Sequence, residues 1–185
     1  MNRGRRGENV FADRDDYETF IALLQETSTM FDLRVSAFCL MSNHYHLLVQ
    51  TPSGSLSRAM RHINGVYTQR FNRRRNIDGQ LFRGRYKSVL VQEDRHLLEL
   101  LRYIHRNPVT AHMCKAVDDY LWTSHQGYVS SVKKWDWLHK GALLDRFSKE
   151  LNEAKRHYQK ACAMRKFCSR SHRLFQQKEL GIIFW

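Results

Sequence analysis

Residues 33–51 read LRVSAFCLMSNHYHLLVQT, two largely apolar runs on either side of a short polar segment. The runs, residues 33–40 and 44–51, have the length and composition that are typical of strands. Met41-Ser42-Asn43 lies between them and is short enough to form a tight turn. This stretch therefore predicts an antiparallel β-hairpin.

Apolar residues at helical spacing precede and follow the hairpin. Residues 13–30 begin at Asp13 and residues 56–75 follow Ser55, and both of these side chains can cap a helix. The apolar residues that recur are Tyr17, Phe20, Ile21 and Leu24 in the first segment, and Leu56, Met60, Ile63, Tyr67 and Phe71 in the second. We expect one helix in each segment.

A further strand and a further helix complete this part of the chain. Residues 80–92 partly alternate and predict a strand. A helix should open at Glu93-Asp94, bury Leu97, Leu101 and Ile104, and close at Asn107-Pro108, because proline disfavours helix in the residue before it.

The predicted order is helix, strand, strand, helix, strand, helix. With one more strand at the front it would be the split β-α-β plan of a ferredoxin-like domain. The expected fold class is therefore α+β, an antiparallel ferredoxin-like sheet with helices on one face and without the first strand. Only residues 1–10 stand where that strand would lie.

The last third of the chain has a helical pattern. Residues 143–168 are its clearest stretch, and Trp122, Trp135 and Trp137 precede them. We expect a domain over 1–128 and a helical extension over 129–185, packed on the domain or used against DNA.

Charge points to a polyanionic partner. The chain has 31 Lys and Arg against 18 Asp and Glu, a formal net charge of +13, which favours nucleic acid over an acidic membrane surface. No apolar run is long enough to span a membrane, and the basic start lacks a secretory signal's apolar stretch. The four cysteines form no C-x-x-C pair. A cytoplasmic location fits these features.

His44 and His46 are two residues apart in the second predicted strand, so both side chains should lie on one face. Two adjacent imidazoles can supply two ligands to one divalent ion. By itself an H-x-H pair is more often a pair on a strand surface than a metal site.

Tyr103 and Asn107 are four residues apart on the last predicted helix and share a face. Tyr103 could be a core residue and Asn107 a helix-ending residue. Alternatively, the Tyr103 phenol could attack a phosphodiester while His44, His46 and the Asn107 amide oxygen hold a divalent ion that polarises the phosphate. This ligand set suits Mg²⁺ or Mn²⁺, although imidazoles also bind Zn²⁺.

Four blocks of sequence resemble single-tyrosine HUH transposases, including the insertion-sequence and REP-associated tyrosine transposases. They are FCLMSNHYHLLV (38–49), NGVYTQRFN (64–72), GQLFRGRYK (79–87) and LRYIHRNPV (101–109), and the similarity runs over about residues 8–128. The resemblance implies that Tyr103 is the nucleophile and that His44, His46 and Asn107 bind the metal. It also implies cleavage of single-stranded DNA beside a hairpin, with a 5′-phosphotyrosine intermediate, a free 3′-hydroxyl and later rejoining.

Basic residues cluster in two further places. Arg70, Arg73, Arg74 and Arg75 lie at the end of the second predicted helix, and Arg83, Arg85 and Lys87 alternate along the third predicted strand. They could be solvated faces or could contact DNA phosphates. We predict DNA contacts for Arg70, Arg73, Arg74, Arg83, Arg85 and Lys87.

Two other functions stay open, together with a monomeric or homodimeric state. One is a catalytically decayed protein that binds hairpin DNA or RNA without cutting it, and the short N-terminus favours this reading. The other is a metal-dependent hydrolytic nuclease, which would form no covalent adduct.

Overall fold

The computed structural model describes residues 1–91, 94–164 and 182–184. Its elements are β1 (Asn2–Arg3), η1 (Arg5–Gly7), α1 (Arg14–Met30), β2 (Arg34–Met41), β3 (His44–Gln50), α2 (Leu56–Arg75), β4 (Ser88–Leu90), α3 (Asp94–Thr110), η2 (Val117–Asp119), α4 (His125–Val129), η3 (Lys133–Trp135), α5 (Gly141–Leu144), α6 (Leu151–Ala163) and β5 (Ile182–Phe184). The α+β class is confirmed. No helix in these ranges is both long enough and apolar enough to cross a membrane.

The predicted hairpin is formed by β2 and β3. The two strands are antiparallel from Arg34↔Gln50 to Met41↔His44, with an irregularity between Val35 and Ala37. Because strand side chains alternate, Phe38 and Leu40 face one side of the sheet, and Ala37 and Cys39 face the other. His46 lies opposite Cys39 in the register.

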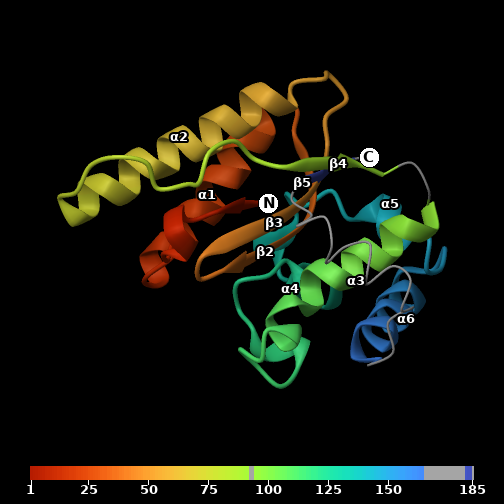
Figure 1. Cartoon of the computed structure of the whole chain (residues 1–185). Helices are drawn as coiled ribbons and strands as arrows, with labels where there is room; N and C mark the ends of the chain where they lie inside the picture. The colour runs from red at the N-terminus through yellow and green to blue at the C-terminus, as the bar shows by residue number, and fades with distance from the viewer. Residues whose placement is uncertain (92–93, 165–181, 185) are drawn as a thin grey trace.

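Helices cover both faces of the sheet. The apolar residues of α1 and α2 pack with Phe38, Leu40, Tyr45 and Leu47 on one face. Those of α3, α5 and α6 pack with Ala37, Cys39 and Leu48 on the other. Figure 1 shows α1 and α2 on one side of the strands, and α3, α4 and α6 on the other. The prediction of helices on one face is thus correct for α1 and α2, but α3 and the C-terminal helices bury the second face.

The first strand, which the sequence was expected to lack, is present in a two-residue form. β1 pairs antiparallel with β3 through Asn2↔Tyr45 and Arg3↔His44. Further along, β3 pairs in parallel with β5 through Leu47↔Ile182, and β5 pairs with β4. Since β2 occupies the other edge of β3 along its whole length, β1 and β5 follow one another along a single edge.

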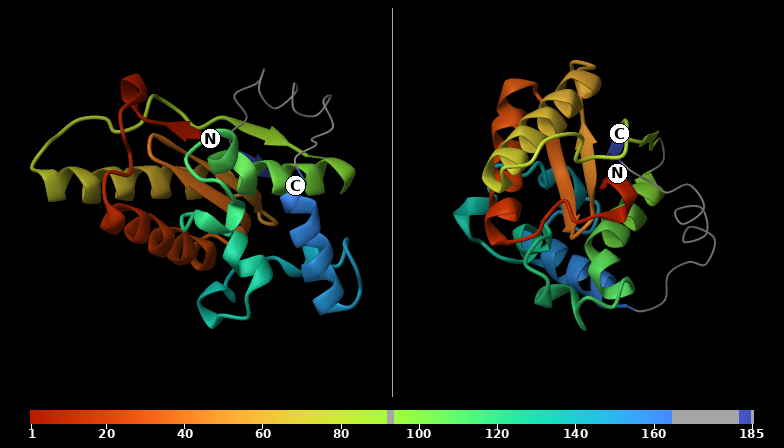
Figure 2. Two further views of the ribbon diagram at one scale, coloured as in Figure 1. Left: turned by 90° about the horizontal axis from the view of Figure 1, so that it is seen from below. Right: turned by 60° about the vertical axis from the view of Figure 1, so that its left-hand side comes forward.

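The third predicted strand is much shorter than expected. Only Ser88–Leu90 of the 80–92 segment is a strand, because Gly79 and Gly84 adopt the left-handed φ values of 91° and 73° and bend the chain between them. The bent segment still lies beside the N-terminus, where the Arg83 amide donates to the Arg3 carbonyl at 2.7 Å and the Lys87 amide to the Met1 carbonyl at 3.1 Å. Figure 2 shows the two segments side by side.

Helix ends differ in detail from the predictions. Asp13 caps α1 as predicted and accepts a hydrogen bond from the Asp16 amide at 3.1 Å. Ser55 instead donates its hydroxyl to the Phe31 carbonyl at 2.7 Å and does not cap α2. Helix α3 continues through Pro108 to Thr110, because the missing N–H removes only one bond of the helix.

The C-terminal extension packs on the domain. Trp135 of the extension is buried beside Phe38, with ring centroids 6.0 Å apart. Trp122, which precedes the extension, stacks on Tyr17 at 4.4 Å. Within the predicted 143–168 stretch, α6 covers Leu151–Ala163, and residues 165–168 lie outside the described part. These two tryptophans therefore serve packing.

Gly4 gives a test of how the N-terminal segment packs. A Cβ at Gly4 would lie 2.1 Å from the Glu8 carbonyl oxygen, whereas a Cβ at Gly65, inside α2, would meet nothing within 4 Å. We expect Gly4→Ala to destabilise the protein by about 1–3 kcal/mol through the clash. Gly65→Ala should stabilise it by about 0.5–1 kcal/mol. Urea unfolding measures both, and a Gly4→Ala protein as stable as wild type would contradict this packing.

Candidate active site

Strand β3 carries the two histidines side by side. The rings of His44 and His46 lie edge to face, with centroids 4.9 Å apart, on the face of the sheet that α3 covers. His46 is buried and His44 is half-buried. The alternation of strand side chains therefore does what the sequence predicted for this pair.

Helix α3 brings Tyr103 against this pair. The Tyr103 ring meets the His46 ring edge to face, with centroids 5.8 Å apart. Asn107 is one turn further along α3, and its side-chain nitrogen donates to the Tyr103 backbone carbonyl at 2.9 Å. That bond occupies the amide nitrogen and leaves the amide oxygen as the atom that a cation would use. Strand and helix thus bring together His44, His46 and Tyr103, with Asn107 beside the tyrosine.

The surroundings of His44 and Tyr103 favour their uncharged forms. Burial, aided by Arg3 and the N-terminal amino group, lowers the pKa of His44 to about 4. Its Nδ1 lies 2.7 Å from Asn43 Oδ1, which can only accept, so Nδ1–H donates and Nε2 keeps its lone pair. Burial raises the pKa of Tyr103, and the neighbouring Asn107 side chain opposes that shift. The tyrosine is therefore a neutral phenol that must lose its proton to react.

These residues fit a divalent cation. Metals bind the neutral form of imidazole, and a second-shell partner such as Asn43 fixes which nitrogen is free to bind. His44 meets both conditions, since burial lowers its pKa and Asn43 fixes its tautomer. Two imidazoles and an amide oxygen form a mixed nitrogen and oxygen ligand set.

A basic surface adjoins the histidines, and half of it, the part formed by Arg3, Arg5 and Arg6, was not predicted from the sequence. Arg3, Arg5 and Arg6 are exposed and lie beside the exposed Arg83, Arg85 and Lys87, because the segments that carry them pair through their backbones. Arg3 is opposite His44 in the sheet. The sequence signal was the basic run NRGRR at residues 2–6, but nothing local shows where that run packs.

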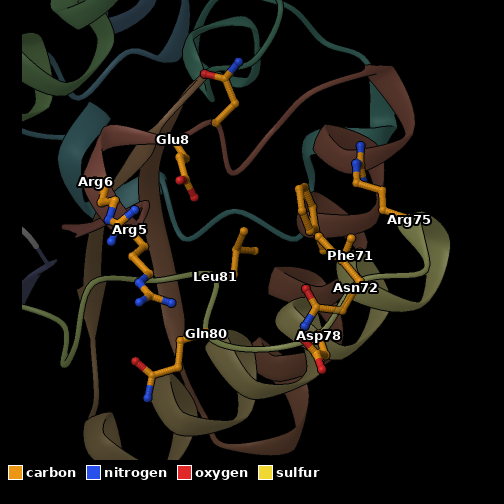
Figure 3. Close-up of a pocket in the computed structure, with 11 residues that line it drawn as sticks. Arg5, Arg6, Glu8, Phe71, Asn72, Arg75, Asp78, Gln80 and Leu81 are labelled. Atoms are coloured by element: carbon orange, nitrogen blue, oxygen red, sulfur yellow. The ribbon is translucent and has the colours of Figure 1, made fainter.

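A pocket of about 410 Å³ lies at the outer end of this surface. Figure 3 shows Arg5, Arg6 and Gln80 on one side of it, and Phe71, Asn72 and Arg75 on the other. The lining carries charges of both signs, since Glu8 and Asp78 contribute to it as well as the arginines. The pocket is thus an open polar hollow next to exposed arginines.

The arginines at the end of α2 are mostly engaged in the fold. Arg74 forms ion pairs with Asp13, Asp15 and Asp16, and Arg75 forms ion pairs with Asp13 and Asp16. Arg70 pairs with Glu26 at 3.4 Å. Arg73 is exposed. The pairs join the end of α2 to α1, so Arg70 and Arg74 have a structural explanation besides the predicted contact with DNA.

The chain is similar to known transposases. Residues 3–107 match the family described as "Transposase IS200 like", a range that contains all four residues of the candidate site. A protein of Haemophilus influenzae described as a REP-associated tyrosine transposase is 24% identical over 135 residues, which cover 66% of this chain and 77% of that protein. No solved structure shows a significant match.

Proposed function

Because the chain belongs to the IS200-like transposase family, we propose that it cuts and rejoins single-stranded, hairpin-associated DNA with Tyr103 as the nucleophile. The observation that carries the proposal is the contact of the Tyr103 ring with His46, which lies beside His44 on β3. A tyrosine against a histidine pair on a rigid strand is an arrangement that can attack a phosphodiester next to a bound cation.

In the proposed reaction the Tyr103 oxygen forms a bond to phosphorus and the bond from phosphorus to the 3′-oxygen breaks. The phenol gives up its proton, and the departing oxygen takes one up as a 3′-hydroxyl. The product is a 5′-phosphotyrosine, which keeps the phosphodiester bond energy, so a second 3′-hydroxyl can reverse the step and join new strands.

Side chains of this site have separate tasks in that step. His46 packs edge to face on the Tyr103 ring and so restricts the direction in which the phenol points. The Asn107 side chain favours the phenolate, since its interaction lowers the pKa of Tyr103 against the effect of burial. When His44, His46 and Asn107 hold Mg²⁺ or Mn²⁺, the ion supplies charge neutralisation at the phosphate.

DNA would approach along the basic surface. Arg3, Arg5, Arg6, Arg83, Arg85 and Lys87 are exposed around the β1 edge, and Arg3 is next to His44 in the sheet. A single strand laid over them would bring its phosphates past the histidines. Contacts of Arg70, Arg73 and Arg74 with the hairpin stem remain part of the proposal. All three are exposed, and Arg70 and Arg74 form ion pairs with residues of the α1 segment, whereas Arg73 forms none with a described residue.

Salt dependence tests the basic surface. We expect affinity for hairpin-tailed DNA to fall with salt by a log–log slope of about −0.7 for each phosphate neutralised on a single strand. Replacing both Arg83 and Arg85 by Ala should therefore make the slope shallower by about 1.4. The measurement is fluorescence anisotropy over a series of salt concentrations.

The matched control is the double variant Arg14→Ala with Arg34→Ala. It removes the same charge from two exposed arginines that pair with Glu18 and Asp32, away from β1. Its slope should stay close to that of wild type. A slope that does not change in the Arg83 and Arg85 variant would show that this face is only solvated.

A further inference from the structure

A buried chain of hydrogen bonds lies on the far side of α3 from Tyr103. It runs from the Phe38 amide to Ser124 Oγ at 2.8 Å, and from Ser124 Oγ to His105 Nε2 at 2.7 Å. It continues from His105 Nδ1 to the Tyr158 hydroxyl at 2.8 Å, and from that hydroxyl to His125 Nδ1 at 2.5 Å. It ends with His125 Nε2 at 3.0 Å from Asp118 Oδ1. The chain thus links β2, α3, α4 and α6 through one residue of the nucleophile's helix.

The Asp118 end of the chain fixes its direction. The Asp118 carboxylate, whose side chain is 68% exposed, can only accept, so His125 Nε2 carries a proton. At the other end Ser124 Oγ accepts from the Phe38 amide, and its hydroxyl can donate to His105 Nε2 at 2.7 Å or to the Phe38 carbonyl at 3.3 Å. One arrangement then satisfies every link with neutral groups. In it His105 carries its proton on Nδ1 and His125 carries its proton on Nε2, while Tyr158 accepts from His105 and donates to His125.

The opposite direction would put a charge in the interior. If Tyr158 donated to His105, His125 would need protons on both nitrogens to satisfy Tyr158 and Asp118 together. Burial lowers the pKa of His125, which disfavours that imidazolium. The neutral arrangement is the one that the surroundings favour.

A metal ion does not explain this cluster. His105, His125 and Cys162 offer ligand atoms within 4.8 Å of one another, as a metal site would. However, the phenol oxygen of Tyr158 lies within hydrogen-bond distance of Nδ1 of both histidines, at the point where an ion would have to bind. Each Nε2 also has its own partner, Ser124 or Asp118. Hydrogen bonds therefore account for both histidines.

The position of His105 on α3 gives the chain a consequence for the active site. His105 is two residues from both Tyr103 and Asn107, which is about 200° around a helix, so it anchors the opposite side. Side-chain tips lie roughly 5–6 Å from a helix axis, so a rotation of about 10° moves a tip by about 1 Å. Since both ring nitrogens of His105 are held, α3 resists such a rotation.

We propose that Tyr158 and His125, from the C-terminal part of the chain, are positioning residues that hold α3 so that Tyr103 points at the scissile phosphate. This rests on the proposed function of Tyr103. A second tie between the same helices supports it, because the Arg106 guanidinium donates to the Cys162 carbonyl and that of Arg102 donates to the Met164 carbonyl at 3.4 Å. The extension would then complete the active site and not merely cover the sheet.

Tyr158→Phe tests the proposal, because it removes only the bridging hydroxyl. At saturating hairpin-tailed DNA with Mn²⁺, the single-turnover rate of covalent adduct formation should fall about 10- to 100-fold, the effect of a misplacement of roughly 1 Å. The DNA dissociation constant should stay within about twofold of wild type, since the basic surface is unchanged.

Tyr128→Phe is the matched control. Tyr128 is equally buried and packs on the Tyr158 ring at 4.8 Å, but its hydroxyl donates to the Ser36 carbonyl of β2 and not to α3. Its rate should stay within about threefold of wild type. Equal loss of rate in the two variants would overturn the positioning role, because both remove a buried hydroxyl from the same core.

The tautomers of His105 and His125 test the hydrogen-bond chain in the wild-type protein, without an activity assay and without any variant that has to fold. Long-range ¹H–¹⁵N spectra of the wild-type protein should show His105 protonated on Nδ1 and His125 on Nε2. A His125 imidazolium, or one equivalent of bound zinc that is lost in Cys162→Ser, would overturn the chain described here. A wild-type protein that forms no adduct would refute the function proposed for Tyr103 and the positioning role with it. A wild-type adduct whose rate of formation falls in Tyr158→Phe and not in Tyr128→Phe would support both.

Discussion

Replacing Tyr103 by Phe should reduce the covalent protein–DNA adduct to background, a loss on the order of 10⁴-fold or more, as when a covalent nucleophile is removed. The substitution deletes only the hydroxyl. The ring keeps its edge-to-face contact with His46, and the Asn107 bond to the Tyr103 backbone carbonyl is unaffected. The readout is a denaturing gel of the protein incubated with labelled hairpin-tailed single-stranded DNA and Mn²⁺. DNA affinity and thermal stability should remain close to those of wild type.

The same gel includes a control variant and distinguishes a transposase from a protein that only binds DNA and from a hydrolytic nuclease. Tyr86→Phe also removes a hydroxyl, one that lies 3.0 Å from Ser57 Oγ beside the basic surface, and it should leave the adduct intact. A protein that only binds DNA would form no adduct in any variant. A hydrolytic nuclease would release free ends from wild type and from Tyr103→Phe alike. An adduct that persists in Tyr103→Phe would assign the chemistry to another tyrosine.

Replacing both His44 and His46 by Ala should weaken Mn²⁺ binding at the site by more than about 100-fold, because loss of an outer-shell partner alone costs about 10- to 100-fold. Asn107→Ala should weaken it less, since water can replace one amide oxygen. Calorimetric titration measures all three proteins. Affinity equal to wild type in the double variant would rule out this ligand assignment.

The stability of the histidine variants must be measured together with their Mn²⁺ affinity, because the two histidines differ in burial. His46 is 3% exposed, so His46→Ala should lower stability by about 1–3 kcal/mol. His44 is half-buried and is the cleaner single variant. The control pair is His62→Ala with His139→Ala, which removes two imidazoles from other parts of the chain. It should leave Mn²⁺ affinity unchanged.

Local periodicity determined the hairpin, the first two helices and the two residue pairs of the candidate site. The turn at 41–43 and the alternation of β3 place His44 and His46 on one face, and helical spacing places Tyr103 and Asn107 on one side of α3. Each of these relations depends on residues at most four apart, for which backbone geometry alone fixes the relative direction of the side chains. The capping of α1 by Asp13 is local in the same way.

The relations between distant residues could be decided only by the tertiary structure. β3 meets a two-residue β1, Arg3 lies beside Arg83, Arg74 pairs with Asp16, and His105 is joined to Tyr158. These partners are 41 to 80 residues apart in the sequence, from Arg3 and His44 at one limit to Arg3 and Arg83 at the other. No periodic signal connects such residues, because their meeting depends on the packing free energy of the whole chain and not on the conformational preference of any segment.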